Sequence, residues 1–467
     1  MPPDEPKYAS AAEEMLKTGD FITPRFNCHV RFDKPPMIYW MIALSYKIFG
    51  VSDWAARLPS ILAALGVILI TYRFSKEMWD GTVAVISSSV FSSILHVWVM
   101  SRAVAPEMVL VFFETLSIYL LWKGLNFKSR KHIILAYIPM ALGFLTKGPL
   151  GVIVPAMVCG LFFLYRDGFR NTVKGLFTPT GILLFCIIGL PWYVAMIKIH
   201  GYRYFEEFFL YHNLYRFTGR ARQHPFAFYY YIPIFLGSLY IWLPFSAGVF
   251  RVIKEGFRER SSELFLFVWM VSVLIFFSVS ANKLHNYILI AYPPISILTA
   301  ISINRRLPST NLIRSGFVIM AIFELAAIVV SPFIQKEIHP FIPLGGLITL
   351  VLTILITINA GSREKLFPLI MIKALSLLLI VNFYMSAFEL KARPGEFYVM
   401  LETIYDPDKT PVFFYKAERE DLVFYAHRCI AVVRNPDEVR KKLDNSKEIL
   451  LYVRTSDMDS LRGFNIQ

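Results

Sequence analysis

Long apolar segments alternate with short polar loops over most of this chain, from Trp54 to Leu390. A helix needs about 20 apolar residues to cross a lipid bilayer, and most of the segments approach that length. The pattern predicts a mainly α polytopic membrane bundle of about twelve spans, at residues 54–72, 82–101, 105–122, 132–146, 149–165, 180–197, 229–250, 263–280, 286–303, 315–334, 341–360 and 366–389. The fourth and fifth spans meet at Lys147-Gly148-Pro149 and are expected to form a helical hairpin.

Two polar regions flank the apolar segments. In the first fifty residues, 9–17 predicts a helix that starts after Pro6 and ends at Gly19, and 37–49 predicts an amphipathic helix at a membrane surface.

The composition changes at Lys391. Strand-like segments at 411–415, 422–425 and 449–453 and a helix at 437–443 predict a small α/β domain. We therefore expect a membrane domain at 1–390 and a soluble domain at 391–467.

The composition fits a membrane protein: 56% of the residues are hydrophobic, 18% are charged, and the mean hydropathy is +0.51. Soluble domains are typically about 45–50% apolar and about 25% charged. In a multi-span protein the net charge of +14 reflects basic cytoplasmic loops, so we expect no nucleic acid among the partners. The four cysteines show no metal-ligand spacing, and Cys159 and Cys186 are expected to fill the core.

Lys and Arg are distributed unevenly between the two sets of loops. Eighteen lie at 73–76, 123–131, 166–174, 251–260, 305–314 and 363–365, and nine lie on the opposite side, five of them in the loop 198–228. The richer side is cytoplasmic by the positive-inside rule. Segment 1–50, loop 198–228 and the C-terminal region therefore face outward.

The outward position of residues 1–50 raises a question of translocation, because no cleavable signal peptide opens the chain. We expect a hydrophobic helix upstream of Met1, absent through a misassigned start or a truncation. The alternative is that the first span carries this short segment across.

Polar residues gather at the outward ends of the spans. Arg102 and Glu107 flank a turn at Ala105-Pro106, Lys147 lies in the hairpin turn, and a third cluster runs from Asn282 to Tyr287. The long loop adds His212-Asn213, Arg216-Phe217 and Gln223-His224-Pro225. Each alone is explained by snorkelling at helix ends or by interfacial aromatic residues. Together they predict an outward cavity, lined by cations with two or three carboxylates, for an anionic lipid phosphate.

Four further polar residues, His96, Glu114, Glu324 and Lys373, fall within the spans. Polar groups in hydrocarbon are costly, so each requires a partner or a role. Glu114 lies close to Glu107 in the sequence and is a candidate for the same cavity. The other three are expected to be interhelical partners or snorkelling residues.

A sugar carried on a polyprenyl phosphate leaves with that phosphate, which suits this set of residues. Cations stabilise the departing anion, and a carboxylate can deprotonate a hydroxyl acceptor. The pair Asp4-Glu5 could supply the base, although a lone acidic pair is commonly a solvated surface feature. The candidates for the positive field are Lys34, Lys147, Arg216, His224 and Lys283. A glycine-rich phosphate loop after a strand is absent from the sequence, which disfavours a cytosolic nucleotide-sugar site.

The ordered motifs resemble bacterial GT-C glycosyltransferases, in the branch of the lipid A aminoarabinose transferases and the protein O-mannosyltransferase-like enzymes. The resemblance covers most of residues 1–300. It rests on Asp4-Glu5-Pro6-Lys7-Tyr8, Glu14-Met15-Leu16, Gly19-Asp20-Phe21, Asp33-Lys34-Pro35-Pro36, Arg102 to Glu107, Thr146-Lys147-Gly148, Tyr215-Arg216-Phe217, Gln223-His224 and Lys283 to Leu289.

The resemblance implies a membrane enzyme that moves a sugar from a polyprenyl-phosphate carrier to an outer acceptor, with Asp4 as the base. Carrier-phosphate contacts would map to Lys34, Arg216 and Lys283. Two positions depart from the family pattern: Lys7 replaces a common Arg and loses its bidentate fork, and Asp33 replaces a common Glu. Some relatives hold a metal at that acid, so a divalent metal near Asp33 is the one cofactor to consider.

We therefore expect an inverting transferase acting on a lipid A-type lipid, a glycan or a protein. The expected catalytic residues are Asp4, Glu5 and Glu107, and the expected substrate-binding residues are Lys7, Asp33, Lys34, Arg102, Lys147, Arg216, His224, Lys283 and Tyr287. The rival classes are a flippase for lipid-linked sugars, which would carry its site near the midplane, and a non-catalytic paralogue that binds carrier lipid.

Substituting Asp4→Asn removes the proposed base at constant size. The variant is expected to insert into membranes at the wild-type level and to lose sugar transfer from a polyprenyl-phosphate donor, because the acceptor hydroxyl keeps its proton. Transfer assays on membranes matched for protein content measure the effect. Full activity of the variant would defeat the assignment of Asp4.

Overall fold

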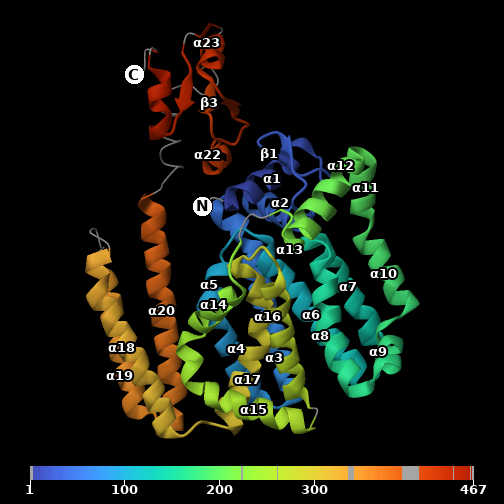
Figure 1. Ribbon diagram of the computed structural model, residues 1–467, viewed down its shortest axis with the longest axis vertical. Coiled ribbons are helices and arrows are strands. Elements are labelled where there is room, and N and C mark those ends of the chain that lie inside the picture. Colours follow the sequence, from blue (N-terminus) through green and yellow to red (C-terminus); the bar gives the residue numbers. More distant parts are fainter. Residues whose placement is uncertain are drawn as a thin grey trace. The chain divides into compact units, whose positions relative to one another are not determined.

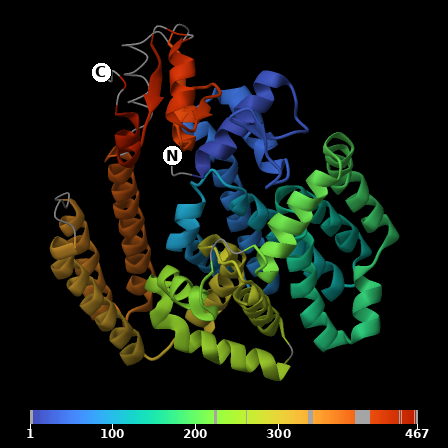
Figure 2. The same ribbon diagram turned by 45° about the horizontal axis from the view of Figure 1, so that its top comes forward.

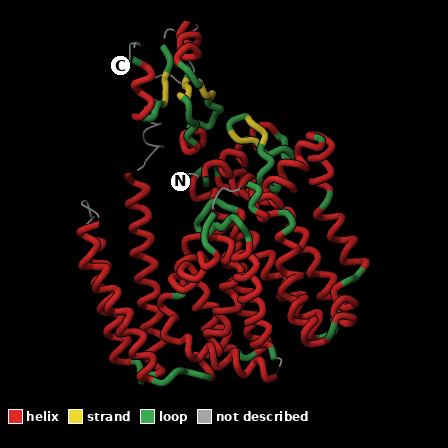
Figure 3. Tube along the Cα trace, viewed as in Figure 1, coloured by secondary structure: helices red, strands yellow, loops and turns green. Residues whose placement is uncertain are grey.

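Two compact units make up the chain. The computed structural model describes residues 4–221, 225–259, 261–334, 341–391, 410–444, 446, 448–462 and 464. One unit contains residues 1–31, 39–56 and 386–467, and the other contains 32–38 and 57–385. Helices dominate the second unit, and in the described part of the chain the strands all belong to the first (Figure 3).

The apolar segments form helices, as expected. Their bounds are α3 (Asp53–Met78), α4 (Gly81–Ser92), α5 (Leu95–Met100), α6 (Pro106–Asn126), α7 (Arg130–Lys147), α8 (Leu150–Asp167), α9 (Phe169–Leu176), α10 (Pro179–Gly189), α11 (Pro191–His200), α12 (Tyr202–Phe205), η1 (Glu206–Tyr215), α13 (Arg216–Thr218), η2 (Phe228–Tyr230), α14 (Tyr231–Ser238), η3 (Tyr240–Phe245), α15 (Ser246–Glu259), α16 (Ser262–Val279), η4 (His285–Ala291), α17 (Tyr292–Arg305), α18 (Thr310–Ile334), α19 (Phe341–Asn359) and α20 (Arg363–Lys391). Figure 1 labels most of them.

Six helices among the described residues are long and apolar enough to cross a membrane, and the number rises to eight if two bent pairs each form one span. A helix satisfies its own backbone hydrogen bonds, which is what a segment in hydrocarbon requires. The chain is therefore a mostly helical membrane protein. These six to eight candidates are fewer than the twelve segments that hydropathy suggested.

Several predicted spans are shorter or broken. The segment 82–101 divides into α4 and α5 at Ser93, whose hydroxyl donates to the carbonyl of Val90 (2.8 Å) in competition with the helix ladder. The segment 180–197 divides at Pro191, which lacks the N–H that would continue α10. Residues 229–250 form two helical pieces bent by 86°.

The predicted hairpin at the end of α7 is present, and glycines permit it. Gly148 has φ +66°, a backbone conformation that residues with a Cβ rarely adopt. A Cβ on Gly151 would lie 2.2 Å from the carbonyl carbon of Gly143, so only glycine allows α7 and α8 to approach this closely.

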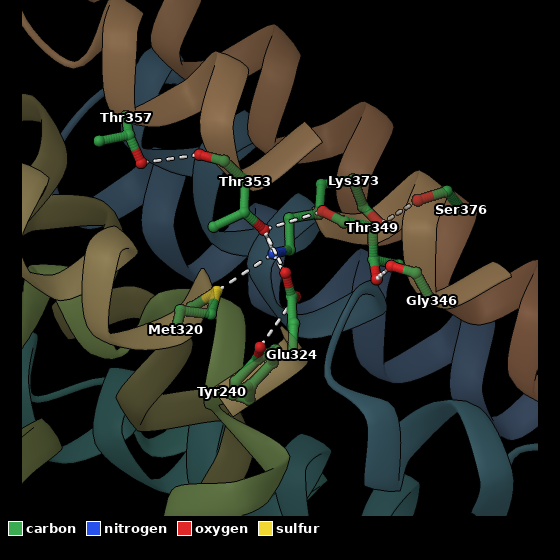
Figure 4. A network of polar contacts seen from close by, with 9 residues as sticks. All are labelled: Tyr240, Met320, Glu324, Gly346, Thr349, Thr353, Thr357, Lys373 and Ser376. Atoms are coloured by element: carbon green, nitrogen blue, oxygen red, sulfur yellow. Dashed lines mark hydrogen bonds and ion pairs between the residues drawn. The ribbon is translucent and has the colours of Figure 1, made fainter. Parts of the chain in front are cut away.

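Helices α18, α19 and α20 run side by side (Figures 1 and 2). A buried ion pair joins α18 to α20, with Lys373 Nζ 2.6 Å from Glu324 Oε1. Tyr240 of η3 donates to the same carboxylate (2.8 Å), and Thr353 of α19 donates to its second oxygen (2.7 Å), as Figure 4 shows. The expectation that Glu324 and Lys373 are interhelical partners is confirmed.

Replacing one member of this ion pair should cost more than replacing both. Lys373→Met leaves the Glu324 carboxylate buried without its cation and is expected to lower the free energy of unfolding by roughly 3 kcal/mol. Lys373→Met combined with Glu324→Leu should recover most of that loss. Thermal unfolding in detergent micelles measures both variants. A double variant as unstable as the single one would contradict the pairing.

The first unit begins with α1 (Glu5–Thr18), which ends at Gly19 in the left-handed conformation, as predicted. A hairpin follows, formed by β1 (Arg25–Phe26) and β2 (His29–Val30). Its two-residue turn, Asn27-Cys28, has positive φ at both positions, as a type I′ turn requires. Helix α2 (Met37–Phe49) has the predicted bounds.

The C-terminal part of this unit is a small α/β fold. Parallel strands lie in the order β4 (Ala431–Val433), β3 (Val412–Tyr415) and β5 (Leu450–Tyr452), connected through α22 (Glu420–Tyr425) and α23 (Pro436–Asp444), with η5 (Thr455–Leu461) at the end. Two predicted strands and the predicted helix are confirmed. The predicted strand at 422–425 is wrong, because those residues form α22. A run of four apolar residues fits either period, and the acidic pair Glu420-Asp421 favours a helix start.

A disulfide between Cys28 and Cys429 joins the hairpin to this α/β fold across 401 residues of sequence. Polar contacts extend the attachment. Asn27 donates to the carbonyl of Ile430 (2.8 Å) and accepts from its N–H (2.7 Å), and Lys17 Nζ donates to the carbonyl of His427 (2.6 Å). This pairing was not predicted from the sequence.

Replacing both cysteines should loosen the first unit selectively. Cys28→Ser with Cys429→Ser is expected to destabilise it by about 2–5 kcal/mol, because the unfolded chain regains the freedom that the crosslink removes. Limited proteolysis should then cut first within the α/β fold. Cys186→Ser, which replaces a free cysteine, is the control, and equal protease resistance of both variants would contradict this role.

Candidate functional site

A cavity of about 340 Å³ lies within the second unit and combines charged and aromatic walls. Its charged and polar lining comes from Asp33, Lys34, Lys147, His212, Asn213, Arg216, Ser280, Asn282 and Tyr287. Its apolar lining comes from Leu150, Ile153, Phe208, Phe209, Leu214, Phe217, Phe276 and Phe277. We call it the cation-lined cavity.

Asp33 and Lys34 enter the cavity from an irregular, non-helical segment before α2. Two prolines follow them, which keeps this segment out of a helix. Lys34 Nζ lies 3.7 Å from Asp33 Oδ2 and donates to the Asp33 carbonyl at 3.1 Å. Burial lowers the pKa of the Lys34 ammonium, against the influence of Asp33.

Lys147 lies at the end of α7 and forms a buried ion pair with Glu107 in the first turn of α6, at 2.8 Å. Its ammonium also lies 4.6 Å from the centre of the Tyr287 ring, a cation–π contact. Glu107 therefore compensates one of the three lining cations, but it is not itself among the residues that line the cavity, where it was expected.

Arg216 is positioned by the loop that precedes η4. Asn282 Nδ2 donates to the carbonyls of Arg216 (2.5 Å) and Ala221 (2.8 Å), and Ala281 N–H donates to the Phe217 carbonyl (3.0 Å). These bonds tie the long loop to the 280–284 turn. The Arg216 Nε is buried and has no hydrogen-bond partner among the described residues.

His212 is a lining residue that the predicted site did not include. It lies one turn before Arg216, and its Nδ1 is buried without a hydrogen-bond partner in the described part of the chain. Burial lowers the pKa of His212 to about 4, so the imidazole is neutral at pH 7. The His212-Asn213 pair stood out in the sequence as part of a polar loop, but the sequence did not tell that the His212 side chain faces the cavity.

Arg102 and Lys283, which were also predicted for the site, are not among the lining residues, although Lys283 contacts one of them. Arg102 stacks on Trp98, 4.1 Å from its ring centre, and donates to Asn382 of α20. Lys283 is buried and donates to the Ser280 carbonyl at 2.6 Å. His224 lies outside the described residues.

The acidic pair of the N-terminus belongs to the first unit. Asp4 is 89% exposed at its side chain and lies 3.3 Å from Lys7 Nζ, which also pairs with Glu420 at 3.0 Å. Glu5 is buried in the first turn of α1. The catalytic role of this pair stays a prediction.

The polar residues within the spans have different outcomes. His96 contacts the Tyr292 hydroxyl (2.9 Å) and the His285 ring (3.1 Å), which confirms it as an interhelical partner. Glu114 is buried and is not part of the cavity lining. Its Oε1 has no hydrogen-bond partner among the described residues.

A metal at Asp33 would need more donors than the cavity brings together. Asp33 and His212 both line it, but the described residues include no group of three or more His, Cys, Asp or Glu side chains that could hold a metal ion. We derive no step through a metal.

Comparisons with known proteins agree with this geometry. The family model described as dolichyl-phosphate-mannose-protein mannosyltransferase matches residues 33–194. A protein of Aquifex aeolicus is 39% identical over 318 residues, which are 68% of this chain and 71% of that protein. The undecaprenyl phosphate-alpha-4-amino-4-deoxy-L-arabinose arabinosyl transferase of Pseudomonas aeruginosa is 28% identical over 383 residues, 79% of this chain and 68% of that enzyme.

The fold also has a solved counterpart. The crystal structure of ArnT from Cupriavidus metallidurans bound to undecaprenyl phosphate superposes with a TM-score of 0.80 at 20% identity, covering 96% of this chain and 85% of ArnT. The fold is thus that of ArnT, and the family model and the named relatives identify the chain as a membrane glycosyltransferase. The chain belongs to the GT-C glycosyltransferase family, as the sequence motifs predicted.

Asn282→Ala should disturb Arg216 without removing any charge. The variant loses two hydrogen bonds that hold the long loop, so we expect binding of a polyprenyl-phosphate carrier to weaken about tenfold, as 1–2 kcal/mol of lost organisation implies. Thr218→Ala removes a bond to Leu214 within the same loop (2.9 Å) and is the control. Titration of the purified variants with the lipid measures both. Unchanged affinity of Asn282→Ala would exclude this positioning role.

Proposed function

We propose that this protein transfers a sugar from a polyprenyl-phosphate carrier to a lipid A-type lipid acceptor at the outer face of the cytoplasmic membrane. One observation carries the donor assignment: a single cavity presents Lys34, Lys147 and Arg216 beside an extended aromatic wall. A phosphate is complementary in charge to the cations, and an isoprenoid chain can pack against the aromatic wall. The names of the relatives support the same class of donor.

The three cations are proposed to hold the carrier phosphate. Burial and the neighbouring charges of Lys147 and Arg216 lower the pKa of Lys34, so a bound phosphate anion would relieve this repulsion. The free Nε of Arg216 supplies a further donor, and charge-assisted bonds to phosphate oxygens are strong. Glu107 is proposed to keep Lys147 charged and in place. Arg102, Lys283 and His224 remain secondary candidates.

The transfer is proposed to be an inverting displacement. The acceptor oxygen attacks the anomeric carbon, the bond from that carbon to the phosphate oxygen breaks, and the carrier leaves as polyprenyl phosphate. Asp4 takes the proton of a hydroxyl acceptor, with Lys7 and Glu5 beside it. An acceptor that is itself a phosphate is already ionised, and Asp4 would then orient it.

Two independent features support an outward first unit. The loops predicted to be cytoplasmic carry twice as many Lys and Arg as the opposite loops. The disulfide Cys28–Cys429 joins the N-terminal hairpin to the C-terminal fold, and disulfides persist in oxidising compartments such as the periplasm. The proposal also includes the predicted soluble outer domain at 391–467 and the predicted twelve membrane spans.

Transfer in detergent tests the proposal, because a flippase cannot move a sugar covalently between two lipids. We expect purified protein to form glycosylated acceptor lipid and free polyprenyl phosphate, read by mass spectrometry. Arg216→Gln should lower kcat/KM about 10- to 100-fold, as loss of a charge-assisted bond implies. Arg220→Gln is the matched control, since Arg220 is exposed in the same loop and does not line the cavity. Carrier binding without transfer would instead favour a non-catalytic lipid-binding protein.

A further inference from the structure

A second cavity, of about 540 Å³, lies where the chain turns between α6 and α7 and between α8, α9 and α10. We call it the α6–α10 cavity. Its wall includes Asn126, Lys128, Arg130, Arg166, Asp167 and Lys174. These turns belong to the lysine- and arginine-rich loops, so the cavity faces the cytoplasm in the proposed orientation. The inference below rests on that orientation and not on sugar transfer.

The charge of this cavity is largely uncompensated. Arg166 forms a two-pronged ion pair with Asp167, at 2.8 and 2.9 Å, and donates to Asn126 at 2.7 Å, so this acid is neutralised locally. Lys128, Arg130 and Lys174 are exposed. The side chains of these three residues form no hydrogen bond or ion pair with another described residue. The cavity therefore presents three cations and no available acid.

The local backbone holds one of these cations in place. Lys128 has φ +52°, in the left-handed region that non-glycine residues rarely adopt. The turn is fixed by a hydrogen bond from the Ser129 N–H to the Gly124 carbonyl, at 2.8 Å. The chain thus presents Lys128 from a rigid turn rather than from a free loop.

Exposed aromatic residues lie in the cavity wall and next to it in the sequence. Phe177 lines the cavity and is 64% exposed, Phe127 lies between the lining residues Asn126 and Lys128 and is 58% exposed, and Phe169 at the start of α9 is 75% exposed. Large exposed aromatic residues beside a basic cluster suit the membrane–water interface, where acyl chains cover the rings and headgroups meet the cations.

We propose that the α6–α10 cavity binds the phosphate of an anionic phospholipid headgroup from the cytoplasmic leaflet. Basic pockets between membrane helices on this side are suited to such headgroups. The shared chemistry is a phosphate anion, which free inorganic phosphate would also offer. The exposed aromatic residues Phe127, Phe169 and Phe177 favour the lipid, because its acyl chains can cover their rings.

Lipid retention tests the proposal on the full-length protein in detergent. The probe is phosphatidylglycerol, compared with phosphatidylcholine, and native mass spectrometry counts the lipid that stays bound. The triple variant Lys128→Gln, Arg130→Gln, Lys174→Gln is expected to retain phosphatidylglycerol about tenfold less than wild type. The control triple Arg251→Gln, Arg258→Gln, Lys254→Gln removes the same charge from exposed positions of α15 outside the cavity, and should retain the lipid like wild type.

The outcomes separate the alternatives. Equal loss in both triple variants would overturn the proposal, because retention would then reflect general surface charge. Stabilisation by inorganic phosphate alone, with no added effect of phosphatidylglycerol, would overturn the lipid assignment. Lys174→Gln, at an exposed position, keeps the test decisive if the triple variant does not fold, and should still lower retention severalfold. The readout is lipid binding, so its failure is distinct from a failure of the transfer assay.

Discussion

Burial of charge is the constraint on which the second unit depends. A lysine or glutamate removed from water is tolerated when a partner compensates it, and removing that partner costs several kcal/mol. Glu107 and Lys147 meet this requirement across α6 and α7, and Glu324 and Lys373 meet it across α18 and α20. The first pair lies beside the cation-lined cavity and the second lies among the late helices, so the same physics serves a site in one place and helix packing in the other.

In the cation-lined cavity, not every buried polar group has a partner among the described residues. Glu107 pairs with Lys147 and Asp33 lies beside Lys34, but Arg216 keeps a buried nitrogen without a partner in the described chain. A protein that only packed its helices would gain by satisfying that group. A protein that must bind and release a lipid phosphate benefits from leaving it available. Asn282, from a loop remote in sequence, holds Arg216 by donating to its backbone carbonyl. The contact fixes the position of Arg216 and leaves its guanidinium N–H groups available to a ligand.

Much of the fold and part of the site could be predicted from periodicity and motif order. The helix at 37–49, the α7–α8 hairpin and two of the C-terminal strands follow from local patterns that the tertiary structure does not override. Lys34, Lys147, Arg216 and Tyr287 were expected to share a cavity, and all four line one. Arg102 and Lys283 carried the same kind of signal, but their side chains bind Asn382 and the Ser280 carbonyl. A one-dimensional motif does not specify the direction of a side chain.

The sequence by itself determined that the chain is a polytopic helical membrane protein of the GT-C family, because hydropathy and motif order are local properties. Only the tertiary structure decided which polar residues of the outward cluster line the cavity, that 422–425 is helical, and that Cys28 pairs with Cys429 across 401 residues. These outcomes depend on which distant segments meet. Contacts between distant segments are set by packing of the whole chain, and short stretches of sequence carry little information about them.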